Sequence, residues 1–242
     1  MAKTNGLNVR LYVEGYDLSG DANALSGLGY TNELLDVTTL DVSARKRIIG
    51  TVDSEVTFEA WFDNASSRQH AVWTSNSGKL PTADQDILIP MGSAVGDPSM
   101  GLIAKEGTYN VARASGSAIS ATATFSANGS AAEFGEMLTA LDDTHSSAGS
   151  GTVVDSGASS SNGGSGYLQL LSLDSGSVTV NLQEATSSGG SYSNFMTFST
   201  VAAAAAPSAE RLTMEGTVQR YIKVTTTGTF SNSKIVVGFS RS

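Results

Sequence analysis

A strict two-residue alternation in residues 55–62 (EVTFEAWF) constrains the fold more than any other feature of the sequence. Successive side chains of a β-strand point to opposite faces of a sheet. Val56, Phe58, Ala60 and Phe62 therefore share one face, whereas the polar residues and Trp61 share the other. This pattern predicts a strand with one buried face.

Further segments of this kind predict a mainly β protein with antiparallel sheets. Ser, Thr and Gly make up 86 of the 242 residues, a composition typical of strands joined by short turns. Turns are expected at 174–176 and 187–190, and residues 15–36 read as one long loop. The expected strands are 8–16, 87–89, 107–113, 117–126, 168–173, 178–182, 220–225 and 235–239.

One short helix is expected in the first half of the chain. Asp63 or Asn64 can cap a helix of about ten residues, in which Ala65, Val72 and Trp73 face inward. The second half contains no helical pattern.

The charge distribution divides the chain into two predicted domains. Residues 1–145 carry 18 acidic and 9 basic side chains, whereas residues 146–242 carry five of each. Residues 144–166 have linker-like Ser/Gly composition, with a short strand at 153–154. We expect a β-sandwich or barrel with one helix in 1–145 and an antiparallel β-sandwich in 146–242.

Charge and composition exclude several classes of function. A net charge of −9 disfavours non-specific binding to nucleic acid or to an anionic membrane. The absence of cysteine excludes disulfides, thiolate metal sites and a cysteine nucleophile. The sequence shows neither the apolar core of a signal peptide nor a membrane-spanning run, which predicts synthesis in the cytoplasm.

No catalytic constellation can be assembled from the sequence. His70 and His145 stand alone, and the acidic pairs at 84/86 and 142/143 lack the spacing of a calcium loop. None of the common phosphate-binding, nucleophile-elbow or zinc-protease motifs occurs. We expect a protein that is not an enzyme and that has no cofactor or metal.

Three features point instead to assembly. Arg45, Lys46 and Arg47 form a basic run that is either a solvated hairpin loop or an arm docking on an acidic neighbour. Trp61 lies on the polar face of its strand, where either a helix of the same chain or a partner subunit must cover it. The long loop expected at 15–36 is of a kind that is often interfacial.

The order of these segments resembles the major tail proteins, or tail tube proteins, of long-tailed bacteriophages. The resemblance covers nearly the whole chain and is carried by several degenerate motifs. They are 35–41 (LDVTTLD), 51–63 (TVDSEVTFEAWFD), 133–140 (EFGEMLTA), 210–221 (ERLTMEGTVQRY) and 237–241 (VGFSR).

This resemblance implies a structural protein of the virion tail. Members of the family form hexameric rings that stack into a hollow tube, and DNA crosses the tube without specific binding. The implied partners are further copies of the chain, the tape measure, the tail terminator and the tail tip, all assembled in the cytoplasm of a host bacterium. The implied stacking loop spans about 41–52 and contains Asp41, Arg45, Lys46, Arg47, Ile48 and Ile49.

The resemblance assigns two further segments. A stacking arm is implied at about residues 1–7, and the second domain projects outward from the tube. Two other functions stay open: a capsid decoration protein, or a carbohydrate-binding adhesin. For the adhesin, Tyr192 and Phe195 are the candidate ligand contacts.

Overall fold

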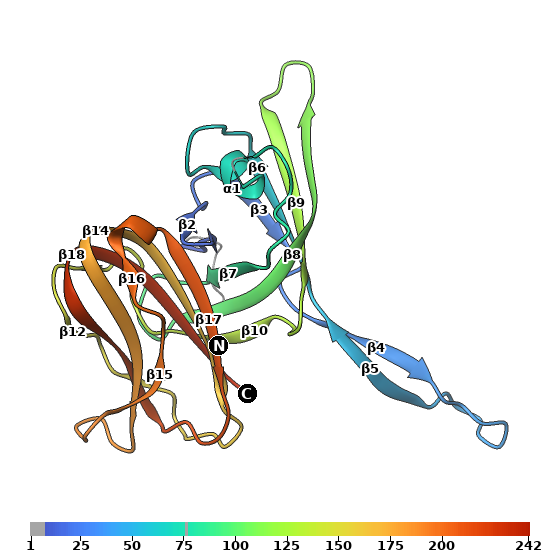
Figure 1. The fold of residues 1–242 in the computed structure, drawn as a ribbon. Helices are drawn as coiled ribbons and strands as arrows, with labels where there is room; N and C mark the ends of the chain where they lie inside the picture. Colours follow the sequence, from blue (N-terminus) through green and yellow to red (C-terminus); the bar gives the residue numbers. More distant parts are fainter. Residues whose placement is uncertain (1–7, 76) are drawn as a thin grey trace.

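A computed structural model describes residues 8–75 and 77–242 of the chain. It consists of two β-rich parts side by side and a two-stranded hairpin that extends away from both (Figure 1). The strand pairs are antiparallel throughout the described residues. The prediction of a mainly β fold with one short α-helix is confirmed for this part of the chain.

Strand β8 (Pro98–Arg113) organises the first part of the molecule. Its first half pairs with β7 (Gln85–Pro90) on one side and with β10 (Glu133–Met137) on the other. Strand β7 also pairs with β1 (Tyr12–Val13), which forms a tight hairpin with β2 (Tyr16–Asp17). The strand expected at 8–16 is therefore shorter than predicted, because only Tyr12 and Val13 pair before the chain turns. Gly15 permits this turn with a φ of 81°.

The second half of β8 belongs to a four-stranded sheet in the order β3, β6, β9, β8. Strand β8 pairs with β9 (Ile119–Ala127), β9 with β6 (Glu55–Trp61), and β6 with β3 (Ala22–Ser26). Because β8 takes part in both halves, the sheet curls and encloses a core. We call the outward surface of these four strands the polar face.

The alternation of apolar and polar residues in β6 matches the alternation of buried and exposed side chains in the structure. Val56, Phe58 and Ala60 are completely buried. The Phe58 ring lies 5.1 Å from that of Phe125 and 6.3 Å from that of Trp73, centroid to centroid. Burial of three large aromatic side chains between the sheet and helix α1 stabilises this part of the molecule.

Helix α1 (Gln69–Trp73) is half as long as predicted and begins later. Asp63 accepts the N–H of Ala65 at 2.9 Å, which forms a turn ahead of the helix, and Ala65 is exposed. The Asp21 carboxylate accepts the N–H of Gln69 at 3.1 Å, so a residue distant in sequence provides the hydrogen-bond acceptor for the first N–H of the helix. Trp73 faces inward, as expected.

The prediction that residues 15–36 form one long loop was wrong. This stretch contains β2, β3 and β4 (Thr31–Asp36), and β4 pairs with β5 (Arg47–Asp53). Every residue of β4 is exposed, so the strand lacks the apolar alternation that would reveal it in the sequence.

Two long strands build the second part of the molecule. Strands β14 (Gly164–Ala185) and β18 (Tyr221–Arg241) pair along almost their entire length. The turn expected at 174–176 does not exist, because Ser175 and Gly176 pair with Ser231 and Phe230. The four strands expected in these ranges are therefore two strands.

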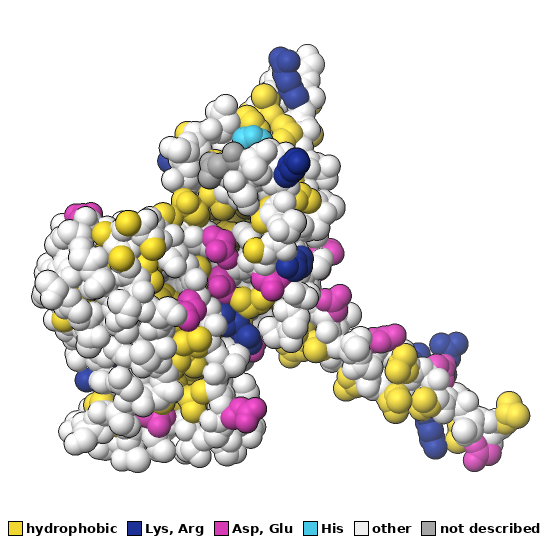
Figure 2. Space-filling model, in the orientation of Figure 1, with side chains coloured by type: hydrophobic (Ala, Val, Ile, Leu, Met, Phe, Trp, Pro, Cys, Tyr) yellow, Lys and Arg dark blue, Asp and Glu magenta, His cyan; other side chains and the backbone are white. Residues whose placement is uncertain are grey.

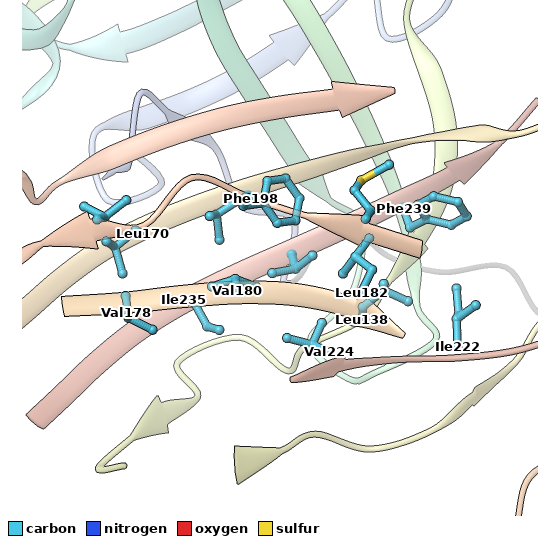
Figure 3. Close-up of a cluster of buried hydrophobic side chains, with 14 of the residues drawn as sticks. Leu138, Leu170, Val178, Val180, Leu182, Phe198, Ile222, Val224, Ile235 and Phe239 are labelled. Carbon is cyan, nitrogen blue, oxygen red and sulfur yellow. The ribbon is translucent and has the colours of Figure 1, made fainter. Parts of the chain in front are cut away.

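Short strands border the long pair on both sides. The region expected to be a linker carries three of these short strands, and all three pair with β18. One of them, at 154–155, corresponds to the strand expected at 153–154. The core between these elements is aliphatic, with Phe198 and Phe239 (Figure 3). The bordering elements are β11 (Thr144–His145), β12 (Gly149–Ser150), β13 (Val154–Asp155), β15 (Ser193–Thr197), β16 (Val201–Ala202), the 3₁₀ helix η1 (Ala203–Ala205) and β17 (Ser208–Met214).

A polar and aromatic junction joins the two parts. Glu133 on β10 accepts hydrogen bonds from Arg211 Nη2 at 2.9 Å, from Ser165 Oγ at 2.9 Å and from the Tyr167 hydroxyl. Burial, together with the neighbouring Glu133 carboxylate, raises the pKa of Tyr167. The Tyr167 ring packs over Gly101, where an added Cβ would lie 2.3 Å from it. The division into domains at 145/146 stays a prediction.

Candidate functional site

The β4–β5 hairpin is the most exposed apolar element among the described residues. Its register places Leu34 opposite Ile49 and Leu35 opposite Ile48. These four side chains are between 41% and 67% exposed. Figure 2 shows hydrophobic side chains along the hairpin, far from the rest of the chain. Solvent-exposed aliphatic clusters of this kind mark interaction sites.

The structure divides the predicted stacking segment between a loop and a strand. Asp41, Arg45 and Lys46 lie in the connection between β4 and β5, whereas Arg47, Ile48 and Ile49 belong to β5. The expectation that the whole segment is a loop was therefore wrong. Its role in stacking stays a prediction, and the implied arm at residues 1–7 lies outside the described residues.

Local hydrogen bonds order the connection. Thr38 Oγ1 accepts the N–H of Lys46 at 2.9 Å, and Val37 donates its N–H to the Lys46 carbonyl, also at 2.9 Å. The Thr39 hydroxyl donates to Asp41 and lowers the pKa of that carboxyl. Within residues 8–75 and 77–242, the salt bridges include none of the three basic side chains at 45–47, which we call the basic tip. The basic tip is thus exposed and free to meet acidic groups.

The four-stranded sheet has a free edge at each end. Strand β3 pairs only with β6, and its other side meets no strand of the described chain. At Ala104 strand β8 has β7 on one side and β9 on the other, and Ala104 pairs with Gln85, the first residue of β7. From 105 to 113 the β7 side of β8 therefore has no partner strand among the described residues. Unpaired backbone N–H and C=O groups in such edges are templates for pairing with another chain.

Trp61 lies on the polar face and is 52% exposed. Helix α1 packs on the opposite face, through Trp73 and Phe58, so the helix of the same chain does not cover Trp61. A hollow of about 400 Å³ beside it is lined by residues that include Asn23, Glu59 and Arg113. Its place in a subunit interface stays a prediction.

The two candidate ligand contacts of the second part differ in their surroundings. Tyr192 donates its hydroxyl proton to the Ser188 carbonyl at 3.1 Å, and Lys223 Nζ lies 4.3 Å from the centre of its ring. Phe195 packs edge-on against Phe239, with ring centroids 5.5 Å apart, and so contributes to the core. Ligand binding at either residue stays a prediction.

Strand β8 carries a buried carboxyl, close to Tyr109, that the sequence pattern did not reveal. Glu106 on β8 is 6% exposed, and its side-chain oxygens have no hydrogen-bond partner in the described structure. Burial raises the pKa of Glu106 to about 8, so the carboxyl is neutral at pH 7. Nearby, His70 Nδ1 lies 2.8 Å from the Tyr109 hydroxyl. Only the interruption of the β8 pattern by an acidic residue could have revealed Glu106.

Among the described residues, no group of three or more His, Cys, Asp or Glu side chains is arranged to hold a metal ion. No helix in the same residues has the length and apolar character needed to cross a membrane.

No protein-family model and no curated protein matches this chain. Several solved structures align with this chain at low similarity. A chain of a native gene transfer agent virion is 14% identical, with a TM-score of 0.43, and the match covers 55% of this chain and 98% of that one. A chain of the sheath–tube complex of an extracellular contractile injection system is also 14% identical, with a TM-score of 0.44, over 55% of this chain and 92% of that one.

A third match spans most of this chain. The Dit protein of phage SPP1, described as a hub of the adsorption apparatus, is 12% identical with a TM-score of 0.37. The match covers 96% of this chain and 98% of the Dit protein. Likenesses this distant assign no function.

Proposed function

We propose that this protein is a structural subunit of a phage-type tail tube. Copies of the chain form hexameric rings, and the rings stack into a hollow tube that conducts DNA during infection. The protein belongs in the virion tail, is assembled in the bacterial cytoplasm, and meets a tape measure, a terminator and a tail tip. It has no catalytic role.

The free edges of the four-stranded sheet carry this proposal. When one strand edge of a copy pairs with a different edge of the next copy, the contact is head-to-tail. Such contacts generate a closed ring if the rotation closes, and a closed ring leaves no edge exposed. The two edges available for this contact are β3 at one end of the sheet and residues 105–113 of β8 at the other.

The polar face supports a conduit for DNA. Glu55 and Glu59 are exposed there, beside hydroxyl side chains such as Thr57 and Thr124, whose Oγ1 atoms lie 3.3 Å apart. A sheet closed through its two edges turns one face toward the lumen. With a net charge of −9 per chain, a surface of carboxylates and hydroxyls repels the DNA phosphates and prevents adhesion.

Lysine substitutions at the two edges test ring formation. Ala24 on β3 and Val111 on β8 are both exposed, so A24K and V111K leave the monomer folded and place a charge where the edges meet. Each variant alone should sediment as a monomer. Mixed together, they should form a one-to-one pair, because V111K keeps a functional β3 edge and A24K keeps a functional β8 edge.

The control is Ser188→Lys in an exposed turn of the second part, which should assemble like the unmodified protein. Normal assembly of A24K and V111K would refute edge pairing. If the unmodified chain stays monomeric but binds preformed capsids, the decoration function replaces the proposal. If the chain binds a glycan array and Tyr192→Ala abolishes that binding, the adhesin function replaces the proposal.

A further inference from the structure

In the turn between β1 and β2, the backbone of the first part of the molecule lies directly against the second part. A Cβ added to Gly15 in this turn would lie 2.6 Å from the Ser208 nitrogen on β17 and 2.8 Å from the Leu170 carbonyl oxygen on β14. Gln169 on β14 is completely buried and joins the turn to β7. Its Oε1 accepts the N–H of Gly15 at 2.7 Å, and its Nε2 donates to the Asp86 carbonyl at 3.0 Å. One side chain of the second part therefore holds both the turn and β7.

Two carboxyl groups meet at this place. The N–H of Glu14 donates to the Asp86 carbonyl at 3.0 Å, and the Glu14 carboxyl accepts the N–H of Asp86 at 2.6 Å. Oδ1 of Asp86 is buried and has no hydrogen-bond partner in the described structure. Glu14 has a φ of 52°, in the left-handed region that residues with a Cβ rarely adopt. An unpaired buried oxygen and a strained backbone both oppose the docking of the turn. We call the set Glu14, Gly15, Asp86 and Gln169 the turn contact.

The charges around the turn contact are mostly negative. Glu210 and Arg211 on β17 both act on Asp86, whose carboxyl also accepts the backbone N–H of Arg211. The Arg211 guanidinium is already paired with Glu133 at 2.9 Å, and it donates to the Tyr167 hydroxyl at 3.0 Å. Figure 2 shows acidic side chains along the boundary between the two parts. Four carboxyls, including that of Glu14, thus share one guanidinium, and their full ionisation would leave like charges in a buried contact.

A hollow beside the turn contact is open to solvent. It has a volume of about 270 Å³ and lies between the β1–β2 turn and helix α1. Its lining consists of Glu14 and Tyr16 from the turn, Gln85 from β7, and Ala71, Val72 and Ser75 from α1 and the residues that follow it. A proton can therefore reach and leave the Glu14 carboxyl while the rest of the fold stays closed.

We propose that one proton shared by Glu14 and Asp86 holds the β1–β2 turn against the second part, and that loss of this proton loosens the turn. The proton removes one of two like charges and converts one carboxyl into a hydrogen-bond donor. Without it, two neighbouring carboxylates repel each other at a place that Glu210 makes more negative. The chain runs from this turn into β3, so a loosened turn also holds the start of β3 less firmly. This switch acts within one chain and does not depend on the proposed function.

The direction of the pH dependence follows from the burial of the two carboxyls. Burial, and after it the Glu14 charge, raises the pKa of Asp86 from 3.8 to about 7, and burial also raises the pKa of Glu14. In the loosened turn both groups titrate near their ordinary values. Between about pH 4 and pH 7 the docked turn keeps a proton that the loosened turn has lost, so docking weakens as the pH rises through this range. Above about pH 7 neither state holds the proton, and the weakening is complete.

Backbone hydrogen exchange of the dilute chain tests this switch. Protection factors of the amides at 12–17 are measured by NMR at pH 5 and pH 8, relative to the intrinsic exchange rate at each pH. They should fall roughly tenfold or more from pH 5 to pH 8, whereas those of β6 should fall less. Asp86→Asn should remove most of this fall and Glu14→Gln should reduce it, because each replaces a carboxyl by a neutral group of the same shape. The matched control is Glu215→Gln at an exposed position, which should behave like the unmodified chain.

Two results would overturn the inference. One is equal protection of the turn at pH 5 and pH 8 in the unmodified chain. The other is a fall of the same size in the unmodified chain, in Asp86→Asn and in Glu14→Gln, because the fall would then come from other groups. If Asp86→Asn leaves the turn unprotected at both pH values, Glu14→Gln decides the question: a reduced fall supports the shared proton, and an undiminished fall overturns it.

Discussion

Replacing the exposed cross-strand pair of the β4–β5 hairpin, Leu34→Thr with Ile49→Thr, should impair assembly without affecting the fold. Full burial of a Leu or Ile side chain contributes about 1.5–3 kcal/mol. Leu34 is 61% and Ile49 67% exposed, so about two thirds of each contribution remains to be gained on assembly. The pair then contributes about 2–4 kcal/mol per contact, and its loss lowers the association constant roughly 30- to 700-fold.

The assay is the critical concentration for assembly, measured by pelleting across a dilution series. The critical concentration should rise by that factor. The urea midpoint of the dilute monomer should not change, because threonine is a β-branched residue that suits an exposed strand position. Leu80→Thr, at a 37% exposed loop position, is the matched control. An unchanged critical concentration, or a lower urea midpoint, would refute the reasoning.

Three further predictions test the tip, the buried carboxyl and the junction. Changing the basic tip to three glutamates should abolish tube growth while the monomer stays folded, and normal tubes by electron microscopy would exclude the stacking role. Burial raises the pKa of Glu106 to about 8, so the unfolded state loses this proton at a lower pH than the folded state does, and the stability of the fold decreases as the pH rises from about 4.5 to 8. The Glu106→Gln variant should show a smaller decrease in its urea midpoint over this pH range. The decrease that remains is due to Asp86, whose pKa is raised to about 7. Gly101→Ala should lower the free energy of unfolding in urea by about 1–3 kcal/mol, because the added Cβ would lie 2.3 Å from the Tyr167 ring. The control Gly107→Ala, whose Cβ would lie 3.8 Å from its nearest neighbour, should lower it less. Equal losses would show that the Tyr167 contact is not critical.

The sequence predicted the strands that have one buried face. Strand β6 shows this best, because Val56 and Phe58 enter the core while Glu55 and Glu59 stay outside. Helix α1 was placed correctly around Trp73 but its start was not, because Asp21, from a distant part of the chain, satisfies its first N–H.

Other elements could not be predicted because their determinants are not local. Strand β14 continues through Ser175 and Gly176, which read as a turn, because β18 offers a partner along the whole length. Strand β4 was missed for the opposite reason. Leu34 and Leu35 are adjacent and face different sides, which destroys the alternation of a half-buried strand. The basic tip was identified from its charges, whereas the free edges of the sheet emerge only from the pairing of β3, β8 and β9.

Negative-stain electron microscopy of the purified protein over a range of concentrations tests the central claim most directly. The proposed function predicts hollow tubes of uniform width, with rings of six copies in end-on views. Particles of single-chain size at every concentration would contradict it.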